Sequence, residues 1–298
     1  QSIRGDSNLR PGFSICGLNG KTGFAAWSVL FWVSFVAGEI ESPSDLQFHR
    51  WTEQLSSKDW ILQAEAMQGL GKWKVESAVP QISGILNKGA SPWVRGRAMV
   101  TLGQIQGDQM LSFAHKAARD KSPILRMAAL ETFELVGGNN AAPVVKDLLK
   151  DPDVRVQAMA AALYASQFPG EAWPIVDRLT SSNQASVSKY LLRALAHIGS
   201  EAALKRLENI FKAAEVKGSQ RRDLLKAMSV ADDRAIPLIS WMTAHYALQT
   251  REFSIGRDVL SAHDKMAVVR TFESMLADES TVLYANLASL VVAVQPTP

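Results

Sequence analysis

Apolar residues recur in a fixed register along most of the chain, at intervals of roughly 31 residues. With the position held by Arg155 as reference, the residues at offsets −1, +3 and +7 are apolar in nearly every copy. These offsets lie on one face of an α-helix. The pattern therefore predicts an amphipathic helix at the start of each unit. Six successive copies carry, at the reference position, Gln63, Arg95, Arg126, Arg155, Ser188 and Arg221.

A second register, marked mostly by proline, lies between these helices. Its positions are held by Pro80, Leu111, Pro143, Pro174, Leu204 and Pro237. The first four N–H groups of a helix have no intrahelical partner, so proline in the first turn costs little. We therefore predict that these residues open a second helix in each unit. The first helices should be capped and opened by Ser91-Pro92, Ser122-Pro123 and Asp151-Pro152.

A helix pair of this length cannot bury its apolar face alone, so neighbouring pairs must stack into one continuous core. The sequence thus predicts an all-α fold, a right-handed superhelical α-solenoid of about six or seven stacked antiparallel helix pairs. It should occupy residues 59–298 and end in a degenerate C-terminal cap, with helices over 264–277 and 280–294. Residues 39–58 should hold an entry helix over 46–55.

The repeated motif resembles HEAT-repeat proteins, in particular the bacterial HEAT-like, or PBS-lyase-type, repeats. The resemblance spans about residues 59–245 and rests on Asp-Pro-Asp-Val-Arg155-x-x-Ala158, Ser-Pro-Trp-Val-Arg95-x-x-Ala98 and Ser-Pro-Ile-Leu-Arg126-x-x-Ala129. It implies that the first helices line the convex side and the second helices the concave, usually binding, side. It also implies that Arg95, Arg126 and Arg155 bond carboxylates or carbonyls of the adjoining repeat, a structural role.

The N-terminal segment, residues 1–38, reads as a leader. An apolar run covers residues 24–37, which as a helix would be about 21 Å long, short of the ~30 Å hydrocarbon core. A lysine ahead of the run and small residues after it are typical of a secretory signal peptide cleaved just before Glu39. We therefore expect export to the periplasm or cell envelope. An uncleaved membrane anchor through residues 24–37 and a buried first helix are the alternatives.

Composition and charge exclude several classes of site. The formal net charge is +3, far from the basic balance of a typical nucleic-acid binder. The single cysteine, Cys16, excludes an intramolecular disulfide and a cysteine-based zinc site, and the five histidines show no metal-ligand spacing. Catalytic Ser/His/Asp order, paired carboxylates and a glycine-rich phosphate loop are not evident either. We expect no cofactor and no catalytic activity.

The candidate binding residues lie on the predicted second helices, where the repeat does not dictate the side chain. They are His115, Lys146, Arg178 and Lys205. A denser basic stretch runs from 205 to 226, but Glu201, Glu208, Glu215 and Asp223 alternate with its cations, so a solvated mixed face is favoured over an anion-binding patch. Four tryptophans stand at or near predicted helix starts, where a wedge between units is favoured over an interface role: Trp60, Trp93, Trp173 and Trp241.

The leading hypothesis is an exported, non-catalytic scaffold that binds an unknown protein or peptide on its concave face. The resemblance alone supplies an alternative, because some PBS-lyase-type repeat proteins help to attach or remove bilin chromophores together with a partner subunit. A third hypothesis, nucleic-acid binding through the 205–226 stretch, is disfavoured by the near-neutral charge. No nucleic-acid partner is expected.

Overall fold

The structure, a computed structural model, describes residues 43–89, 91–137, 141–181, 188–213, 218–246 and 250–277. The chain divides into two units, residues 1–33 and 34–298, and all the described residues belong to the second. The predicted leader over 1–38 and the final helix predicted over 280–294 lie outside the described residues. Among the helices of the described part, none is both long and apolar enough to cross a bilayer.

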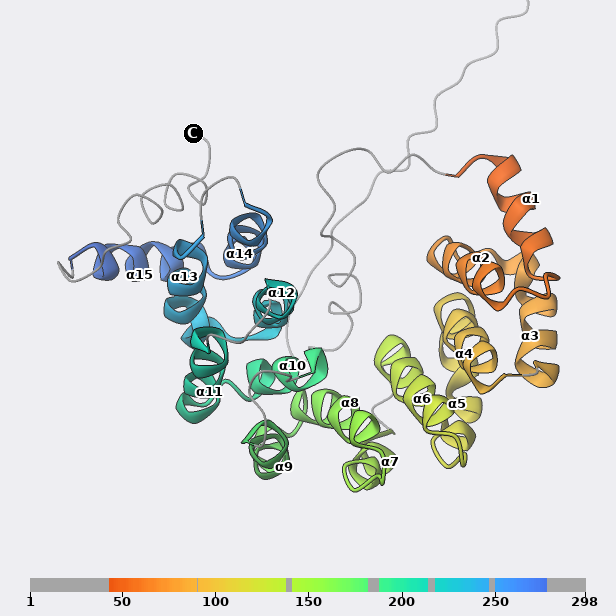
Figure 1. The fold of residues 1–298 in the computed structure, drawn as a ribbon, viewed down its shortest axis with the longest axis horizontal. Helices are drawn as coiled ribbons and strands as arrows, with labels where there is room; N and C mark the ends of the chain where they lie inside the picture. Colours follow the sequence, from red (N-terminus) through yellow and green to blue (C-terminus); the bar gives the residue numbers. More distant parts are fainter. Residues whose placement is uncertain are drawn as a thin grey trace, which may run out of the picture. The chain divides into compact units, whose positions relative to one another are not determined.

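The described residues form seven helix pairs preceded by one entry helix, α1 (Asp45–Gln54). The first helices of the pairs are α2 (Trp60–Lys72), α4 (Pro92–Gln106), α6 (Pro123–Val136), α8 (Val154–Ala165), α10 (Lys189–Ile198), α12 (Gly218–Ala227) and α14 (Arg251–Ser261). The second helices are α3 (Val79–Lys88), α5 (Leu111–Ala117), α7 (Ala142–Leu148), α9 (Pro169–Ser181), α11 (Glu201–Lys212), α13 (Ile236–Ala244) and α15 (Lys265–Ala277). Figure 1 shows them as two layers, the first helices in one and the second helices in the other. The predicted α-solenoid is confirmed.

The core follows the predicted register. In all six aligned units the residues at offsets +3 and +7 are buried, each no more than 5% exposed: Ala66, Ala98, Ala129, Ala158, Leu191 and Leu224, then Leu70, Leu102, Phe133, Ala162, Leu195 and Met228. They join one hydrophobic cluster that runs through the whole stack. Apolar burial therefore holds each pair to its neighbours.

The ends of the helices are set by local chemistry. Ser91 accepts a hydrogen bond from the N–H of Trp93, and Pro92 follows at the first helical position. Gly137 and Gly199 close α6 and α10 in the left-handed conformation, which costs a residue without a Cβ little. These caps turn the chain sharply between the two layers.

Three predicted helix starts are wrong, among them that at Leu204, which is the fourth residue of α11 because Ser200 caps that helix. The N-cap of α8 is Asp153, not Asp151, and Pro152 lies before the helix. Val154 consequently stands at the first helical position with 58% of its surface exposed rather than packed. In α9, Pro174 lies inside the helix instead of opening it, because α9 already begins at Pro169.

The corrected start also shifts the register of the fourth unit. Gln157, four residues after the cap of α8, corresponds to Arg126, four residues after Ser122 at the start of α6. Both side chains donate to the carbonyl six residues earlier: Gln157 Nε2 to Asp151 O (2.5 Å) and Arg126 Nη1 to the matching carbonyl of its own loop (2.9 Å). The interval between these two units is therefore 31 residues rather than 29.

The first helices pack directly on one another along the stack, from α2 through to α14. Small residues permit the approach: a Cβ added at Gly96 of α4 would lie 3.1 Å from the Cβ of Ala128 in α6, and one at Gly103 would lie 3.2 Å from Thr132 Cγ2. Consecutive second helices make such close contact only from α11 to α15. The first-helix layer is therefore the tighter of the two.

The stack bends toward this tighter layer around α8. Arg193 of α10 donates to Glu134 of α6 (Nη2–Oε1 2.5 Å), although these helices belong to units two apart. The pair passes over α8, whose alanines at 158, 160, 161, 162 and 165 are all buried, so that side of α8 lies beneath its neighbours' side chains. Side chains two units apart can meet only on the inner side of a bend. The expectation that second helices line the concave side is wrong here. The smallest side chains lie in the first helices, so the first helices pack more closely and their layer lies on the inner side of the bend.

Candidate functional site

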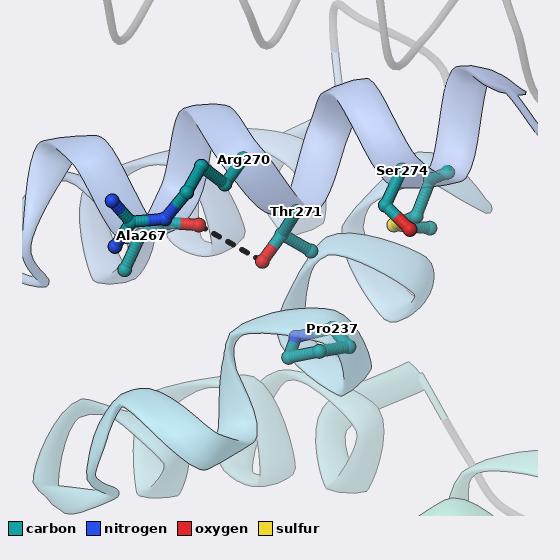
Figure 2. Close-up of a pocket in the computed structure, with 6 residues that line it drawn as sticks. Pro237, Ala267, Arg270, Thr271 and Ser274 are labelled. Atoms are coloured by element: carbon teal, nitrogen blue, oxygen red, sulfur yellow. Dashed lines mark hydrogen bonds between the residues drawn. The ribbon is translucent and has the colours of Figure 1, made fainter.

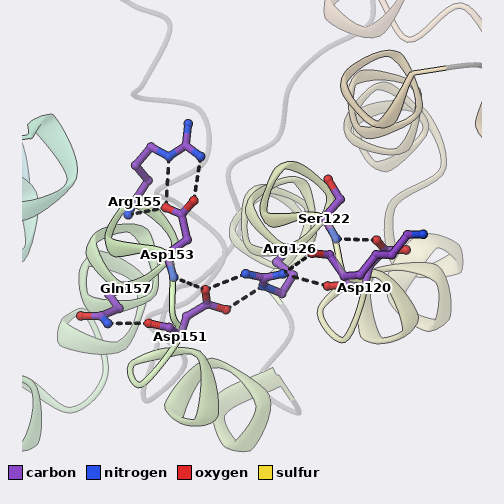
Figure 3. A network of polar contacts seen from close by, with 8 residues as sticks. Asp120, Ser122, Arg126, Asp151, Asp153, Arg155 and Gln157 are labelled. Atoms are coloured by element: carbon purple, nitrogen blue, oxygen red, sulfur yellow. Dashed lines mark hydrogen bonds and ion pairs between the residues drawn. The ribbon is translucent and has the colours of Figure 1, made fainter.

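Arg126 has the structural role predicted for the repeat arginines (Figure 3). Its Nε and Nη2 donate to the two oxygens of Asp151, both at 2.7 Å, and its Nη1 donates to the carbonyls of Asp120 (2.9 Å) and Lys121 (3.1 Å). Both partners are buried, with 11% and 3% of their side chains exposed. The hydrogen bonds to Asp151 raise the pKa of Arg126 and outweigh the effect of burial. Arg126 thus ties the loop before α6 to the loop before α8.

The other two predicted arginines do not repeat this contact. Arg155 is exposed and pairs with Asp153 of its own helix start (Nη2–Oδ2 2.7 Å). The bond from Arg155 lowers the pKa of Asp153 to about 2. The prediction for Arg155 is therefore wrong, because Gln157 occupies the corresponding position. Arg95 has a buried Nε for which the described residues supply no hydrogen-bond partner.

The four candidate binding residues are found on four successive second helices, and the structure does not bring them together. Each has a contact nearby. The His115 ring lies 4.9 Å from the ring of Phe133, Lys146 Nζ lies 2.7 Å from Glu171 Oε2, Arg178 Nη2 lies 3.4 Å from Gln157 Oε1, and Lys205 Nζ lies 2.9 Å from Glu208 Oε2. They form a series of separate contacts rather than one site.

Ion pairs join the second helices between units. Lys146 of α7 meets Glu171 of α9, and Arg206 of α11 meets Asp177 of α9 at 2.6 Å. Tyr164 adds a hydrogen bond to Glu171 (2.8 Å). The bonds from Lys146 and Tyr164 lower the pKa of Glu171, and the bond to Glu171 raises that of Lys146. The charges in this layer thus serve the stack.

The basic stretch over 205–226 forms a mixed face, as the alternation of charges predicts. Glu208 accepts from both Lys205 and Lys212, and these bonds lower its pKa. Arg222 of α12 pairs with Glu252 of α14 at 2.7 Å. The cations of this stretch are therefore largely occupied by carboxylates of the same or the next unit.

A second set of polar residues, not predicted from the sequence, lies on the first-helix layer around α8. We call it the inner polar cluster: Arg97 of α4, Glu131 and Glu134 of α6, and Tyr190, Arg193 and His197 of α10. Arg97 Nη1 approaches Glu131 Oε1 at 3.8 Å, a looser pair than Arg193 with Glu134. Lys189 Nζ lies 5.1 Å from the centre of the Tyr190 ring. Three units therefore contribute side chains to one surface, with α8 of a fourth unit beneath it.

Burial shifts the pKa values of Glu131, Tyr190 and His197 in this cluster toward the neutral form of each group. Burial, and then the neighbouring Glu134, raise the pKa of Glu131 although Arg97 lowers it. Burial raises the pKa of Tyr190, with Glu131 and Glu134 adding to the effect. Burial and Arg193 lower the pKa of His197 to about 4, so its ring is neutral at pH 7. Lys189 lowers the pKa of Glu131 as well, and with 43% of its side chain exposed Glu131 can be reached by a cation from outside.

The described part of the chain also has a cavity of about 370 Å³ between α13 and α15 (Figure 2). It is lined by Pro237, a predicted repeat position, and by Ala267, Arg270, Thr271, Ser274 and Met275. The Thr271 hydroxyl donates to the carbonyl of Ala267 in its own helix (2.9 Å). Arg270 is the one charged residue in this lining, so the cavity does not bring together an acid, a base and a nucleophile. Within the described residues no group of His, Cys, Asp and Glu could hold a metal ion.

Comparison with known proteins agrees with this architecture. Residues 85–166 match the model for HEAT repeats. The chain contains HEAT repeats. Its stack of helix pairs is also similar to a chain of the complex of CpcE and CpcF of phycocyanin lyase from Nostoc sp. PCC7120, with a TM-score of 0.50, 14% identity, and coverage of 88% of this chain and 98% of that one. At this identity the likeness concerns the fold of the HEAT stack. No curated protein matches the chain.

Proposed function

We propose that this HEAT-repeat protein is a non-catalytic scaffold that binds a protein partner through its inner polar cluster. The observation that carries the proposal is Glu131, a carboxylate set on the tightly packed layer and only loosely paired with Arg97 at 3.8 Å. Burial and Glu134 raise its pKa, so a cation from outside would gain by approaching it. The solved relative in this fold is itself a complex of two proteins, which also favours a protein partner.

The partner chemistry follows from the cluster. A basic side chain reaching Glu131 would meet a carboxylate already partly stripped of water, and electrostatic interactions are stronger in such surroundings. Tyr190 lies beside it with its ring half-buried, as aromatic residues at interfaces often do. We therefore expect a protein or peptide that inserts a lysine or arginine beside Tyr190.

The test is co-purification from the native envelope fraction, with matched variants of the full chain. Glu131→Lys should lose the captured protein or weaken its dissociation constant at least about tenfold, since removing one partner of a desolvated pair costs more than 1.4 kcal/mol. Lys205→Glu, on the second-helix layer, is the control and should retain it. Retention by Glu131→Lys together with loss by Lys205→Glu would move the site to the second helices.

The alternative is an accessory subunit of a bilin lyase, and its support is the fold shared with a chain of a phycocyanin lyase complex. It predicts that the protein, with its partner, changes the absorbance spectrum of an added bilin. An unchanged spectrum in a titration with the full chain and the captured partner would reject this alternative and leave the scaffold.

Export remains a proposal from residues 1–38, and N-terminal sequencing of the mature protein would test it by finding Glu39 first.

A further inference from the structure

The loops that lead into the first helices lie side by side along one edge of the stack, which we call the helix-start edge. It comprises the loops before α2, α4, α6 and α8 and the first turns of those helices. Trp60 and Trp93 pack edge to face with ring centres 4.8 Å apart, which joins its first two units. Arg126 and Asp151 join its last two units (Figure 3).

Large apolar side chains project from this edge. Trp60 is 54% exposed, and Ile61, Ile124 and Val154 are also exposed at the first or second position of α2, α6 and α8. These are half of the eight large hydrophobic residues exposed in the described part of the chain. Trp60 is held in place by Trp93, so it is a fixed projection rather than a mobile side chain.

Most carboxylates of this edge form hydrogen bonds or ion pairs with other groups of the same edge. Asp59 caps α2 by accepting from Ile61 N (2.8 Å), and Asp120 accepts from Ser122 N (2.8 Å). Asp151 is buried against Arg126, and Asp153 is paired with Arg155. Asp59 and Asp147, the latter at the end of α7, are the exposed carboxylates among them.

Several exposed cations of this edge, by contrast, are not used in internal ion pairs. Six exposed residues on the same edge have no ion pair among the described residues: Lys58, Lys88, Lys116, Arg119, Lys121 and Lys150. Lys58, Arg119, Lys121 and Lys150 lie in the loops before α2, α6 and α8, and Lys88 is the last residue of α3, directly before the loop to α4. The opposite edge of the same four units is not cationic, since its loops and first helical turns carry Glu76, Asp108 and Glu171 against Lys72 and Lys74. The outer surface of the helix-start edge is therefore cationic with projecting apolar groups.

We propose that the helix-start edge docks on an anionic lipid surface. Tryptophan and isoleucine projecting from a fixed scaffold fit the boundary between headgroups and acyl chains, where tryptophan is enriched. Lysine and arginine beside them attract anionic headgroups, each contributing about 1 kcal/mol, or about fivefold in affinity. The apolar side chains stand out as a ridge, and none of them lines the cavity at α1 with α3 or the one at α13 with α15. A ridge suits insertion into a soft surface better than capture of a peptide.

The experiment is co-sedimentation of the full chain with vesicles of phosphatidylcholine, alone or mixed with phosphatidylserine. The wild type should bind the mixed vesicles, and binding should fall as salt is raised because surface charges are screened. Trp60→Ser with Ile61→Ser should weaken binding at least about tenfold, and Lys121→Glu about fivefold or more. Circular dichroism would verify that each variant keeps its helices.

The matched controls lie on the opposite side of the helix pairs. Phe113→Ser removes an exposed aromatic side chain at the start of α5, and Lys226→Glu reverses an exposed cation at the end of α12. Both should leave vesicle binding unchanged. Equal binding by the wild type and the edge variants would overturn the proposal, because residues 24–37 would then account for it. Binding of polyglutamate but not of mixed vesicles would overturn it too, and would assign the edge to an acidic protein.

Discussion

Removal of Asp151 tests how far the buried pair with Arg126 holds the stack together. The substitution Asp151→Ala leaves the Arg126 guanidinium buried, with two carbonyls but without its carboxylate. Breaking a buried pair in this way costs about 3–5 kcal/mol, and the two remaining carbonyl bonds place the expected loss near 3 kcal/mol. Asp151 also accepts from the N–H of Asp153 (2.8 Å), so the start of α8 should loosen as well.

The assay is urea denaturation followed by circular dichroism, with hydrogen exchange to locate the loss. Apart from the pair of Arg193 with Glu134, the packing of a repeat is with its neighbours, so faster exchange should be concentrated in α6, α7 and α8. Arg155→Ala is the matched control. It removes a bidentate pair with Asp153, two residues after Asp151, but Arg155 is exposed, so the free energy of unfolding should not change measurably.

A double variant, Arg126→Met with Asp151→Ala, completes the cycle. It removes the uncompensated cation, so its loss should be smaller than the sum of the two single losses. A loss below about 1 kcal/mol for Asp151→Ala, or a loss equal to that of Arg155→Ala, would refute the claim that burial makes this pair structural.

Three further predictions concern single positions. The pKa of His197 is about 4 in the folded chain, below its ordinary 6.5, so between these pH values the unfolded chain binds a proton that the folded chain does not. The contribution of His197 to the free energy of unfolding should therefore be full above pH 6.5 and fall by up to about 3 kcal/mol as pH drops to 4. His197→Gln should remove this pH dependence from denaturation curves. Gly256→Ala places a Cβ 2.0 Å from Thr243 Oγ1 and should lower the free energy of unfolding by about 1–3 kcal/mol. Gly84→Ala, in open space within α3, should raise it by about 0.5–1 kcal/mol. Equal melting temperatures for the two variants would contradict both expectations. Ser91→Ala should cost about 1 kcal/mol through loss of the α4 cap, and Ser91→Thr should recover most of it.

The fold was predictable because burial repeats at fixed offsets. A position such as Ala129 or Leu195 is buried by contacts inside its own unit and with the next, and both recur along the sequence. The start of α8 was not predictable in the same way. Asp151-Pro152-Asp153 offers two capping residues, and the choice of the second depends on Arg126, 25 residues away, which binds the first.

The inner polar cluster depends on an even longer separation. Arg193 and Glu134 are 59 residues apart, nearly two repeats, and they meet because the stack bends over α8. Periodicity shows which face of a helix is buried but carries no information about bending. The one available sign was composition: α8 contains five alanines, at 158, 160, 161, 162 and 165, more small residues than a helix with one solvent-facing side requires.

The contrast between the two layers has a mechanical consequence. In the first-helix layer, backbones approach through glycine and alanine, as between Gly96 and Ala128, and packed contacts of this kind resist compression and sliding. Between α7, α9 and α11 the second layer is joined by polar pairs such as Lys146 with Glu171, which water can replace at little cost in free energy. The stack should therefore bend with the first-helix layer nearly unchanged in length. The spacing of the second helices should change instead, as ion pairs between them break and re-form.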